Sequence, residues 1–158
     1  MDMNKVKTGV VGSGAMGSGI AQVAATAGYD VVLFDADQNA LQRAQKSIDS
    51  TLTKLTSKGK ITEEESKNIS GRISYASSLT DFKDCKLIIE AIIENLEIKQ
   101  KVFQQLEDVV GEDCILATNT SSLSVTSIAG ACKIPARICG IHFFNPAPIM
   151  KLVEIISG

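Results

Sequence analysis

The stretch that decides the fold is KVKTGVVGSGAMG, Lys5–Gly17, in which a short apolar segment runs directly into three closely spaced glycines. The part up to Val11 is rich in β-branched residues and predicts a buried first strand. Gly12, Gly14 and Gly17 then match G-x-G-x-x-G, the spacing at which a strand turns into a helix against a dinucleotide pyrophosphate. The first glycine permits the tight turn, the second lets the phosphates approach the backbone, and the third lets helix and strand pack closely. The predicted cofactor loop comprises Gly12, Ser13, Gly14, Ala15, Met16 and Gly17.

An acidic residue stands where this interpretation needs one. Val31–Asp35 predicts the second strand, and Asp35 follows Gly12 by 23 positions, close to the roughly 20 expected for the carboxylate that binds the adenosine ribose. Asp35 and Asp37 would both repel the 2′-phosphate of NADP, so NAD is the expected cofactor. The alternative is a glycine-rich turn without a ligand, with Asp35 only capping the next helix.

The rest of the chain alternates between helical and strand patterns. A long amphipathic helix is predicted over Gln38–Lys58, ended by Gly59, and a capping box at Thr62 starts a second short helix that reaches about Ile69. Further strands are predicted over Ile73–Tyr75, Leu87–Ala91, Ile115–Thr118, Ile138–Phe144 and Leu152–Ile156, and further helices over Glu97–Val110 (with Ile98, Val102, Leu106 and Val109 facing inward) and Val125–Ala129.

This order of elements predicts the fold class. Strands that alternate with helices up to about residue 130 form a mostly parallel, doubly wound α/β sheet of the Rossmann type. The two helices after the second strand are longer than a crossover requires, so they form a helical excursion. The last two strands are joined too tightly for a crossover helix, across Pro146 and Pro148, and should pair antiparallel. Residues 1–158 are expected to form one dinucleotide-binding domain.

Length and composition exclude several classes of protein. The chain has 158 residues, 44% hydrophobic and 22% charged, which is typical of globular proteins. Its net charge of −2 lacks the basic surplus of nucleic-acid-binding proteins, and no apolar run approaches the roughly 20 residues of a membrane span. The four cysteines form no C-x-x-C pair, which predicts buried free thiols and a cytoplasmic location. A single histidine without a ligand pattern argues against a metal site.

The single histidine has a predicted partner. His142 lies near the end of one strand, and Glu154 is the acidic residue in the apolar run of the next. A reversal centred on Pro148 would place the two opposite each other. An imidazole beside a carboxylate suits general acid–base catalysis, because the carboxylate fixes the tautomer and stabilises the imidazolium. From these residues alone, a structural histidine with Glu154 on a solvated edge remains open.

Two long motifs carry a resemblance to a known family. Asn119–Ser124 (NTSSLS) and His142–Pro148 (HFFNPAP), with Met150–Glu154 (MKLVE) after it, resemble the L-3-hydroxyacyl-CoA dehydrogenase family, especially its short-chain bacterial members. Val11–Gly17 and Glu90–Asn95 (EAIIEN) agree with that family as well, so the likeness covers essentially the whole chain. It implies an oxidoreductase of fatty acid or butanoate metabolism. Such an enzyme transfers a hydride between NAD and C3 of a 3-hydroxyacyl-CoA, with 3-hydroxybutyryl-CoA or acetoacetyl-CoA as the expected substrate.

The resemblance also implies roles for individual residues. His142 would be the catalytic acid–base, Glu154 its partner, and Ser121 would bind the reacting oxygen beside the nicotinamide. The other residues that the family would place against ligands are, for the nicotinamide half of NAD, Glu94, Lys99 and Asn145, and, for the CoA moiety, Lys58 and Thr51. On the residues alone, Ser121 could also be only a helix N-cap, and Lys58 only a solvated helix end.

Members of the resembled family continue into a helical C-terminal domain. That domain closes over the acyl-CoA, supplies a further catalytic asparagine and forms a homodimer. We therefore expect this chain to be a fragment, or a protein whose second half is supplied separately, that binds NAD but turns over poorly alone.

Two other functions remain open. A dehydrogenase of a free 3-hydroxy acid would keep the histidine chemistry but would need no role for Lys58. A non-catalytic NAD-binding module would need the glycine loop and Asp35 but not His142 opposite Glu154.

Overall fold

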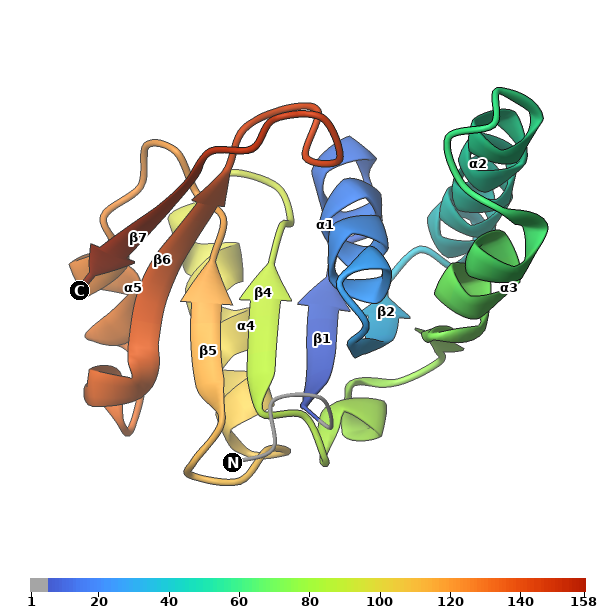
Figure 1. The fold of residues 1–158 in the computed structure, drawn as a ribbon. Helices are drawn as coiled ribbons and strands as arrows, with labels where there is room; N and C mark the ends of the chain where they lie inside the picture. Colours follow the sequence, from blue (N-terminus) through green and yellow to red (C-terminus); the bar gives the residue numbers. More distant parts are fainter. Residues whose placement is uncertain (1–5) are drawn as a thin grey trace.

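The computed structural model describes residues 6–158, which form a seven-stranded sheet in the order β3-β2-β1-β4-β5-β6-β7 (Figure 1). All neighbouring strands pair parallel except β6 and β7, which pair antiparallel. The elements are β1 (Lys7–Val11), α1 (Ala15–Thr26), β2 (Asp30–Phe34), α2 (Gln38–Ser57), α3 (Glu63–Gly71), β3 (Ile73–Ala76), η2 (Leu79–Phe82), β4 (Leu87–Glu90), α4 (Leu96–Glu107), β5 (Ile115–Thr118), α5 (Val125–Ala129), η3 (Pro135–Arg137), β6 (Ile138–Phe143) and β7 (Val153–Ser157). The predicted fold class is confirmed. Lys5, where we expected the first strand to begin, lies outside the described residues.

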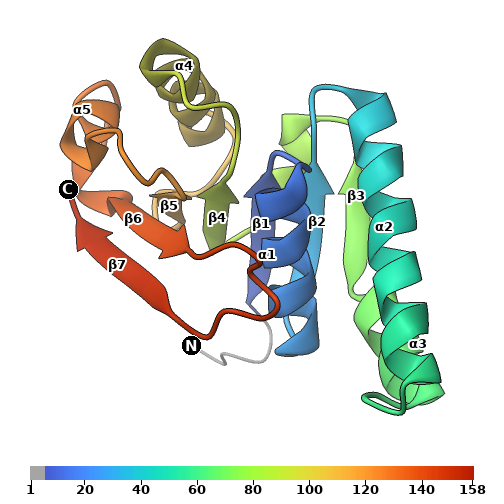
Figure 2. The same cartoon turned by 90° about the horizontal axis from the view of Figure 1, so that it is seen from above.

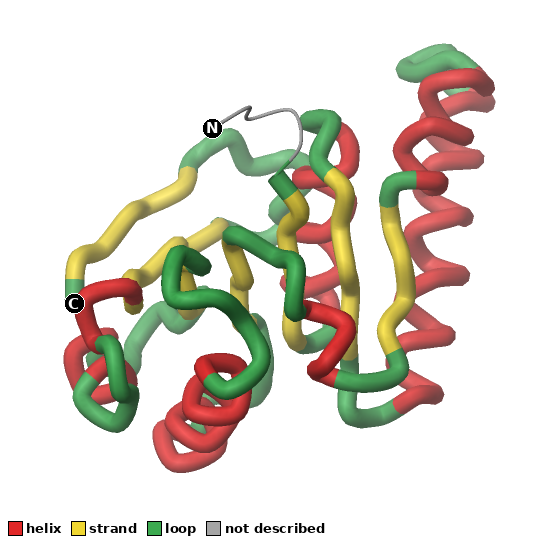
Figure 3. Tube along the Cα trace, turned by 90° about the horizontal axis from the view of Figure 1, so that it is seen from below, coloured by secondary structure: helices red, strands yellow, loops and turns green. Residues whose placement is uncertain are grey.

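The sheet is covered on both faces, as a parallel sheet must be. Helices α1, α2 and α3 pack one apolar cluster against it, and η2, α4 and α5 pack another on the opposite face. Figure 2 shows α1 on one side of the strands and α4 and α5 on the other. The view from below in Figure 3 shows the hairpin of α2 and α3 beyond the β3 edge.

The helical excursion forms as the sequence predicts. Asp37 caps the start of α2 by accepting a hydrogen bond from the Asn39 amide, and Gly59, with φ of +67°, follows the end of the helix. The expected capping box starts α3, because the Thr62 hydroxyl and the Glu65 carboxylate each accept a hydrogen bond from the other residue's backbone amide. Amphipathic α2 buries its apolar side against α1 and the sheet.

One helix faces the core differently from the prediction. The expectation that Ile98 points inward is wrong, because Ile98 is 42% exposed while Lys99 and Phe103 are fully buried. Helix α4 also spans Leu96–Glu107 and not Glu97–Val110. Counting apolar residues missed the inward face because a lysine with a buried ionic partner occupies part of it.

The four cysteines form no disulfide. Cys85 and Cys114 are buried, and Cys132 and Cys139 are partly buried, so the prediction of buried thiols holds fully for only two of them. Within residues 6–158, no helix combines the length and the apolar character that a membrane crossing requires.

Candidate active site

The predicted site residues gather at the carboxyl ends of the strands, where the arrowheads point upward in Figure 1. The glycine loop follows β1, residues 91–95 follow β4, residues 119–124 follow β5, and residues 144–152 follow β6. The strand order reverses between β1 and β4, and ligands of open α/β sheets bind at such a reversal. Loops on both sides of it touch, because a Cβ at Gly12 would lie 2.5 Å from the Ala91 carbonyl oxygen.

The glycine loop leaves the start of α1 open for an anion. Gly12 has φ of +98°, and a Cβ at Gly17 would lie 1.8 Å from the Gly12 carbonyl oxygen, so both positions require glycine. No side chain caps α1, and its first turn holds no acidic residue. A Cβ at Gly14 would project into open space. This space, beside free N–H groups and the positive end of the helix dipole, fits the pyrophosphate of a dinucleotide.

Asp35 is bound to this loop. One of its carboxylate oxygens accepts hydrogen bonds from the Ser13 amide (2.8 Å) and hydroxyl (2.7 Å), and the other accepts one from the Asp37 amide (2.9 Å). Asp37 is the residue that caps α2, so the alternative in which Asp35 caps that helix is wrong. The half-buried Asp35 carboxylate stands beside the glycine loop with acceptor capacity to spare, which suits a ribose diol.

A buried ionic cluster lies behind the loop that follows β4. Glu90 is fully buried, and its carboxylate accepts hydrogen bonds from the Lys99 ammonium (2.5 Å), the Ile92 amide (2.8 Å) and the Thr118 hydroxyl (2.8 Å). Lys99, with a 1% exposed side chain, also lies 3.2 Å from the Glu94 carboxylate. Lys99 thus sits inside the protein between two carboxylates, and Glu94 is the member that reaches the surface.

Glu94 is 46% exposed and has three polar neighbours. Besides Lys99, it accepts hydrogen bonds from the hydroxyls of Thr120 (2.6 Å) and Ser122 (3.5 Å). Burial tends to raise the pKa of the Glu94 carboxyl, but the hydrogen bond from Thr120 and the charge of Lys99 outweigh it and lower that pKa. Glu94 is therefore held as an anion at the carboxyl end of β4.

Glu90 and Thr120 belong to this site although neither is among the residues predicted from the sequence. Glu90 had a usable signal, because a glutamate that ends the apolar run Leu87–Glu90 needs a partner if it is buried. Thr120 had none, because its neighbours in the loop are hydroxyl residues too.

Ser121 lies in the exposed part of the loop after β5. Ser124 is the N-cap of α5 and accepts a hydrogen bond from the Ser127 amide, so the alternative in which Ser121 caps a helix is wrong. The backbone of this loop is fastened by Thr120, whose hydroxyl oxygen accepts a hydrogen bond from the Leu123 amide (3.0 Å). Ser121 thus lies at the surface between Thr120 and Ser122, the two residues that donate to Glu94.

His142 and Glu154 meet as the reversal around Pro148 predicts. They are register partners across β6 and β7, and the imidazole Nδ1 lies 2.9 Å from a Glu154 carboxylate oxygen. The side chains are 17% and 52% exposed. With Nδ1–H donating to the carboxylate, the neutral imidazole carries its lone pair on Nε2, which is the arrangement of a general base.

A side-chain hydrogen bond secures the strand that carries the histidine. The β5–β6 ladder ends at the pair Thr118 and Gly140. Beyond it, the Asn119 amide oxygen accepts a hydrogen bond from the Phe143 N–H (2.8 Å), next to His142. The loop after β5 and the histidine strand are therefore held together.

The segment after β6 reaches over α1 (Figure 1). Within it, Asn145, Pro146, Pro148 and Ile149 line one side of a groove whose other walls come from α1, α2 and α3. The groove has a volume of about 720 Å³, and Ala15 of the glycine loop, Thr51 and Asn145 line it. Lys58, the exposed C-cap residue of α2, is not among its lining residues. The structure thus brings Thr51 and Asn145 to one groove and leaves Lys58 on the helix surface outside it.

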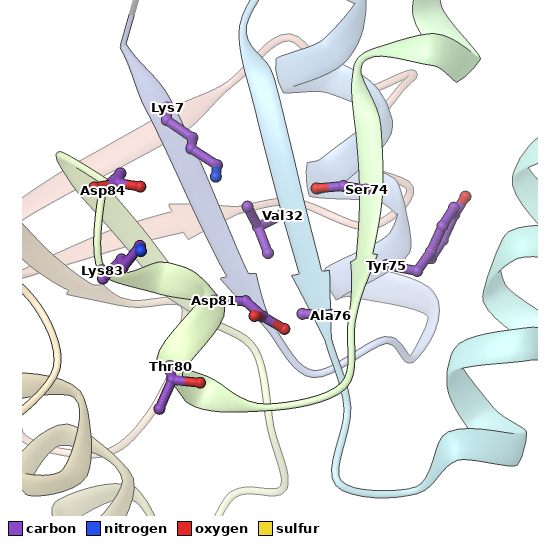
Figure 4. A pocket seen from close by; sticks show the side chains of 9 residues that line it. All are labelled: Lys7, Val32, Ser74, Tyr75, Ala76, Thr80, Asp81, Lys83 and Asp84. Carbon is purple, nitrogen blue, oxygen red and sulfur yellow. The ribbon is translucent and has the colours of Figure 1, made fainter.

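A second hollow, of about 450 Å³, lies away from the predicted site (Figure 4). Lys7 at the start of β1 and Asp84 between η2 and β4 line it, and none of the predicted site residues does. Two of its polar residues are engaged within the fold. Asp81 accepts hydrogen bonds from the Ser77 and Ser78 amides, and the Ser74 hydroxyl donates to the Val31 carbonyl. Because no predicted site residue lines this hollow, we locate the candidate site at the carboxyl ends of the strands.

Comparison with known proteins relates the chain to one family. The profile of the family described as "3-hydroxyacyl-CoA dehydrogenase, NAD binding domain" matches residues 7–158. A probable 3-hydroxybutyryl-CoA dehydrogenase of Deinococcus radiodurans is 48% identical over 153 residues, which cover 97% of this chain and 55% of that protein. The 3-hydroxybutyryl-CoA dehydrogenase of Clostridioides difficile is also 48% identical, over 97% of this chain and 54% of its own length.

A solved structure shares the fold. The crystal structure of 3-hydroxybutyryl-CoA dehydrogenase from Escherichia coli K12 has a TM-score of 0.94 and 43% identity, over 97% of this chain and 32% of that one. The chain thus spans about half the length of these two curated relatives.

Proposed function

The chain belongs to the family of NAD-binding domains of 3-hydroxyacyl-CoA dehydrogenases, and from this membership we propose that it is the cofactor-binding half of such an enzyme. The reaction is hydride transfer between NAD and C3 of a 3-hydroxyacyl-CoA, with 3-hydroxybutyryl-CoA and acetoacetyl-CoA as the substrate pair. The observation that carries the proposal is the hydrogen-bonded pair of His142 and Glu154, which lies at the carboxyl ends of the parallel strands together with the glycine loop.

His142 is the catalytic acid–base of this proposal. In the oxidative direction its Nε2 accepts the proton of the 3-hydroxyl group, and Glu154 stabilises the imidazolium that forms. In the reductive direction the imidazolium returns that proton to the oxygen. Ser121 donates a hydrogen bond to the reacting oxygen and keeps it facing the imidazole. Bound NAD would supply the acceptor for the C3 hydride, and bound NADH its donor.

The cofactor is held by groups on both sides of the strand-order reversal. Residues 12–17 bind the pyrophosphate at the start of α1, and Asp35 binds the adenosine ribose and repels a 2′-phosphate. Glu94 and Asn145 contact the nicotinamide half. Lys99 acts on the nicotinamide half only through Glu94, because its ammonium is enclosed between the Glu90 and Glu94 carboxylates.

The acyl-CoA substrate is assigned to the side of the site formed by α2. Thr51 lies in the groove that Asn145 also lines, and Lys58, at the exposed end of the same helix, offers a cation to the CoA phosphates. Residues 1–158 serve as the dinucleotide-binding domain, and a helical C-terminal half completes the acyl-CoA site and carries a homodimer contact. Four free cysteines support a reducing compartment, and we place the protein in the cytoplasm.

The experiment is an assay of acetoacetyl-CoA-dependent NADH oxidation, with and without the C-terminal half of a curated relative. We expect slow turnover by the chain alone, faster turnover in the mixture, and loss of both in His142→Gln with NADH binding intact. Free acetoacetate should be a poor substrate, because it lacks the CoA moiety. Equal rates with acetoacetate and acetoacetyl-CoA would favour a free-acid dehydrogenase. NADH binding without turnover, both with and without the C-terminal half, would favour a non-catalytic module.

A further inference from the structure

Two carboxylates, Glu90 at the end of β4 and Glu94 just before α4, share the ammonium group of Lys99. The Lys99 ammonium lies 2.5 Å from the Glu90 carboxylate, on its interior side, and 3.2 Å from the Glu94 carboxylate, on the side toward the surface. Glu90 and Lys99 are fully buried, and Glu94 is half-exposed. A pair of a lysine and one glutamate would already be neutral, so the second carboxylate leaves the cluster with a net charge of −1.

The hydrogen bonds show which carboxylate belongs to the ammonium. Glu90 has three donors, from Lys99, the Ile92 amide and the Thr118 hydroxyl, and the protein surrounds it on every side. Glu94 has its two hydroxyl donors in the loop after β5 and only the longer contact with Lys99. Glu90 therefore neutralises Lys99, and the remaining negative charge resides on Glu94, toward solvent.

We propose that Glu90 is a positioning residue that favours the oxidised over the reduced nicotinamide: by neutralising Lys99, it keeps the charge of Glu94 free to act on the cofactor. This inference rests on the proposed function, which places Glu94 beside the nicotinamide. That ring carries a positive charge in NAD⁺ and none in NADH. A net negative cluster therefore stabilises bound NAD⁺ more than bound NADH, and Glu90 acts on the ring only through Lys99 and Glu94.

Loss of the Glu90 charge has a definite consequence. In Glu90→Gln the ammonium keeps a single anionic partner, Glu94, and the cluster becomes neutral. For a charge several ångströms from the ring in a partly solvated site, we expect NAD⁺ to bind about three- to tenfold more weakly, with NADH changed by less than about twofold. The double variant Glu90→Gln/Lys99→Met regains a net charge of −1 on Glu94 and should regain the wild-type ratio of the two dissociation constants.

The test is the ratio of the NAD⁺ and NADH dissociation constants, measured by calorimetry for the 158-residue chain and its variants. Glu107→Gln is the matched control, because Glu107 is also a buried carboxylate bound to a cation, Arg137, but lies at the far end of α4. The ratio should stay at the wild-type value in Glu107→Gln and in Glu90→Asp, which retains the charge. A merely structural role of Glu90 would weaken both cofactors equally in Glu90→Gln and leave the ratio unchanged.

Each outcome has one meaning. A ratio that shifts in Glu90→Gln and returns in the double variant supports the proposal; an unshifted ratio in Glu90→Gln overturns it. If Glu90→Gln does not fold, a double variant whose ratio departs from wild type by more than about threefold overturns it as well. Glu94→Gln separates this inference from the proposed function. A shift there without one in Glu90→Gln refutes only the role of Glu90, whereas no binding of either cofactor by the wild-type chain refutes the proposed function itself.

Discussion

Two buried glutamates, Glu90 at the end of β4 and Glu107 at the end of α4, each have a cation as partner, but the two pairs differ in what surrounds them. Glu90 at the end of β4 shares Lys99 with the exposed Glu94, whereas Glu107 bonds only to groups that the fold itself encloses. Those groups are Arg137 and the amides of Lys133 and Ile134, at 2.7 and 3.0 Å. A buried ion pair is therefore not by itself a mark of function. What distinguishes the Glu90 cluster is a second carboxylate, Glu94, which reaches the surface at the carboxyl ends of the strands, where we propose that NAD binds.

The largest expected difference between these regions is in stability. Lys99→Met leaves the buried Glu90 without a cation, and we expect a loss of about 3–5 kcal/mol in the free energy of unfolding. Arg137→Met should cost less, about 1–3 kcal/mol, because Arg137 lies 3.4 Å from the Glu107 carboxylate whereas Lys99 lies 2.5 Å from that of Glu90. Urea denaturation followed by circular dichroism measures both. Equal losses would mean that the two pairs are energetically alike and would remove the contrast.

Part of the protein's acid sensitivity is expected to come from Glu107. Burial tends to raise the pKa of Glu107, but hydrogen bonds from the Lys133 and Ile134 amides and the charge of Arg137 lower it below the usual 4.5. A carboxyl whose pKa is lowered by folding stabilises the protein above its unfolded pKa and loses that stabilisation as the pH falls through the folded value. Melting temperatures between pH 6 and pH 3 should therefore fall less steeply in Glu107→Gln than in the wild type. An unaltered slope would show that Glu107 does not contribute.

The smallest stability effect is expected at His142 and Glu154, the proposed catalytic pair. His142 and Glu154 are partly exposed, so Glu154→Gln should change the free energy of unfolding by less than about 1 kcal/mol. In the presence of a C-terminal half, turnover should fall by about 10²-fold or more, because the imidazolium loses its stabilising charge. A large loss of stability with unchanged turnover would assign the pair to the fold instead of to catalysis.

Different parts of the molecule were predictable to different degrees. Pattern and turn chemistry predicted the succession of strands and helices, the capping box at Thr62 and the pairing of His142 with Glu154, because each depends on residues close together in sequence. The inward face of α4 was missed although Glu90 is only nine residues before Lys99, because a count of apolar residues leaves a lysine on the outside. The donors of Glu94 come from the loop after β5, and the groove depends on how residues 145–149 lie over α1. The last two features depend on contacts between distant segments, and no local pattern encodes them.

The central claim is that the carboxyl edge of the sheet binds NAD through the glycine loop and Asp35. Fluorescence titration of the 158-residue chain with NADH and with NADPH tests it most directly, in wild type and in Asp35→Ala. We predict that the wild type binds NADH at least about tenfold more tightly than NADPH, and that Asp35→Ala weakens NADH binding and narrows this preference. Titrations that Asp35→Ala leaves unchanged for both cofactors would contradict the claim.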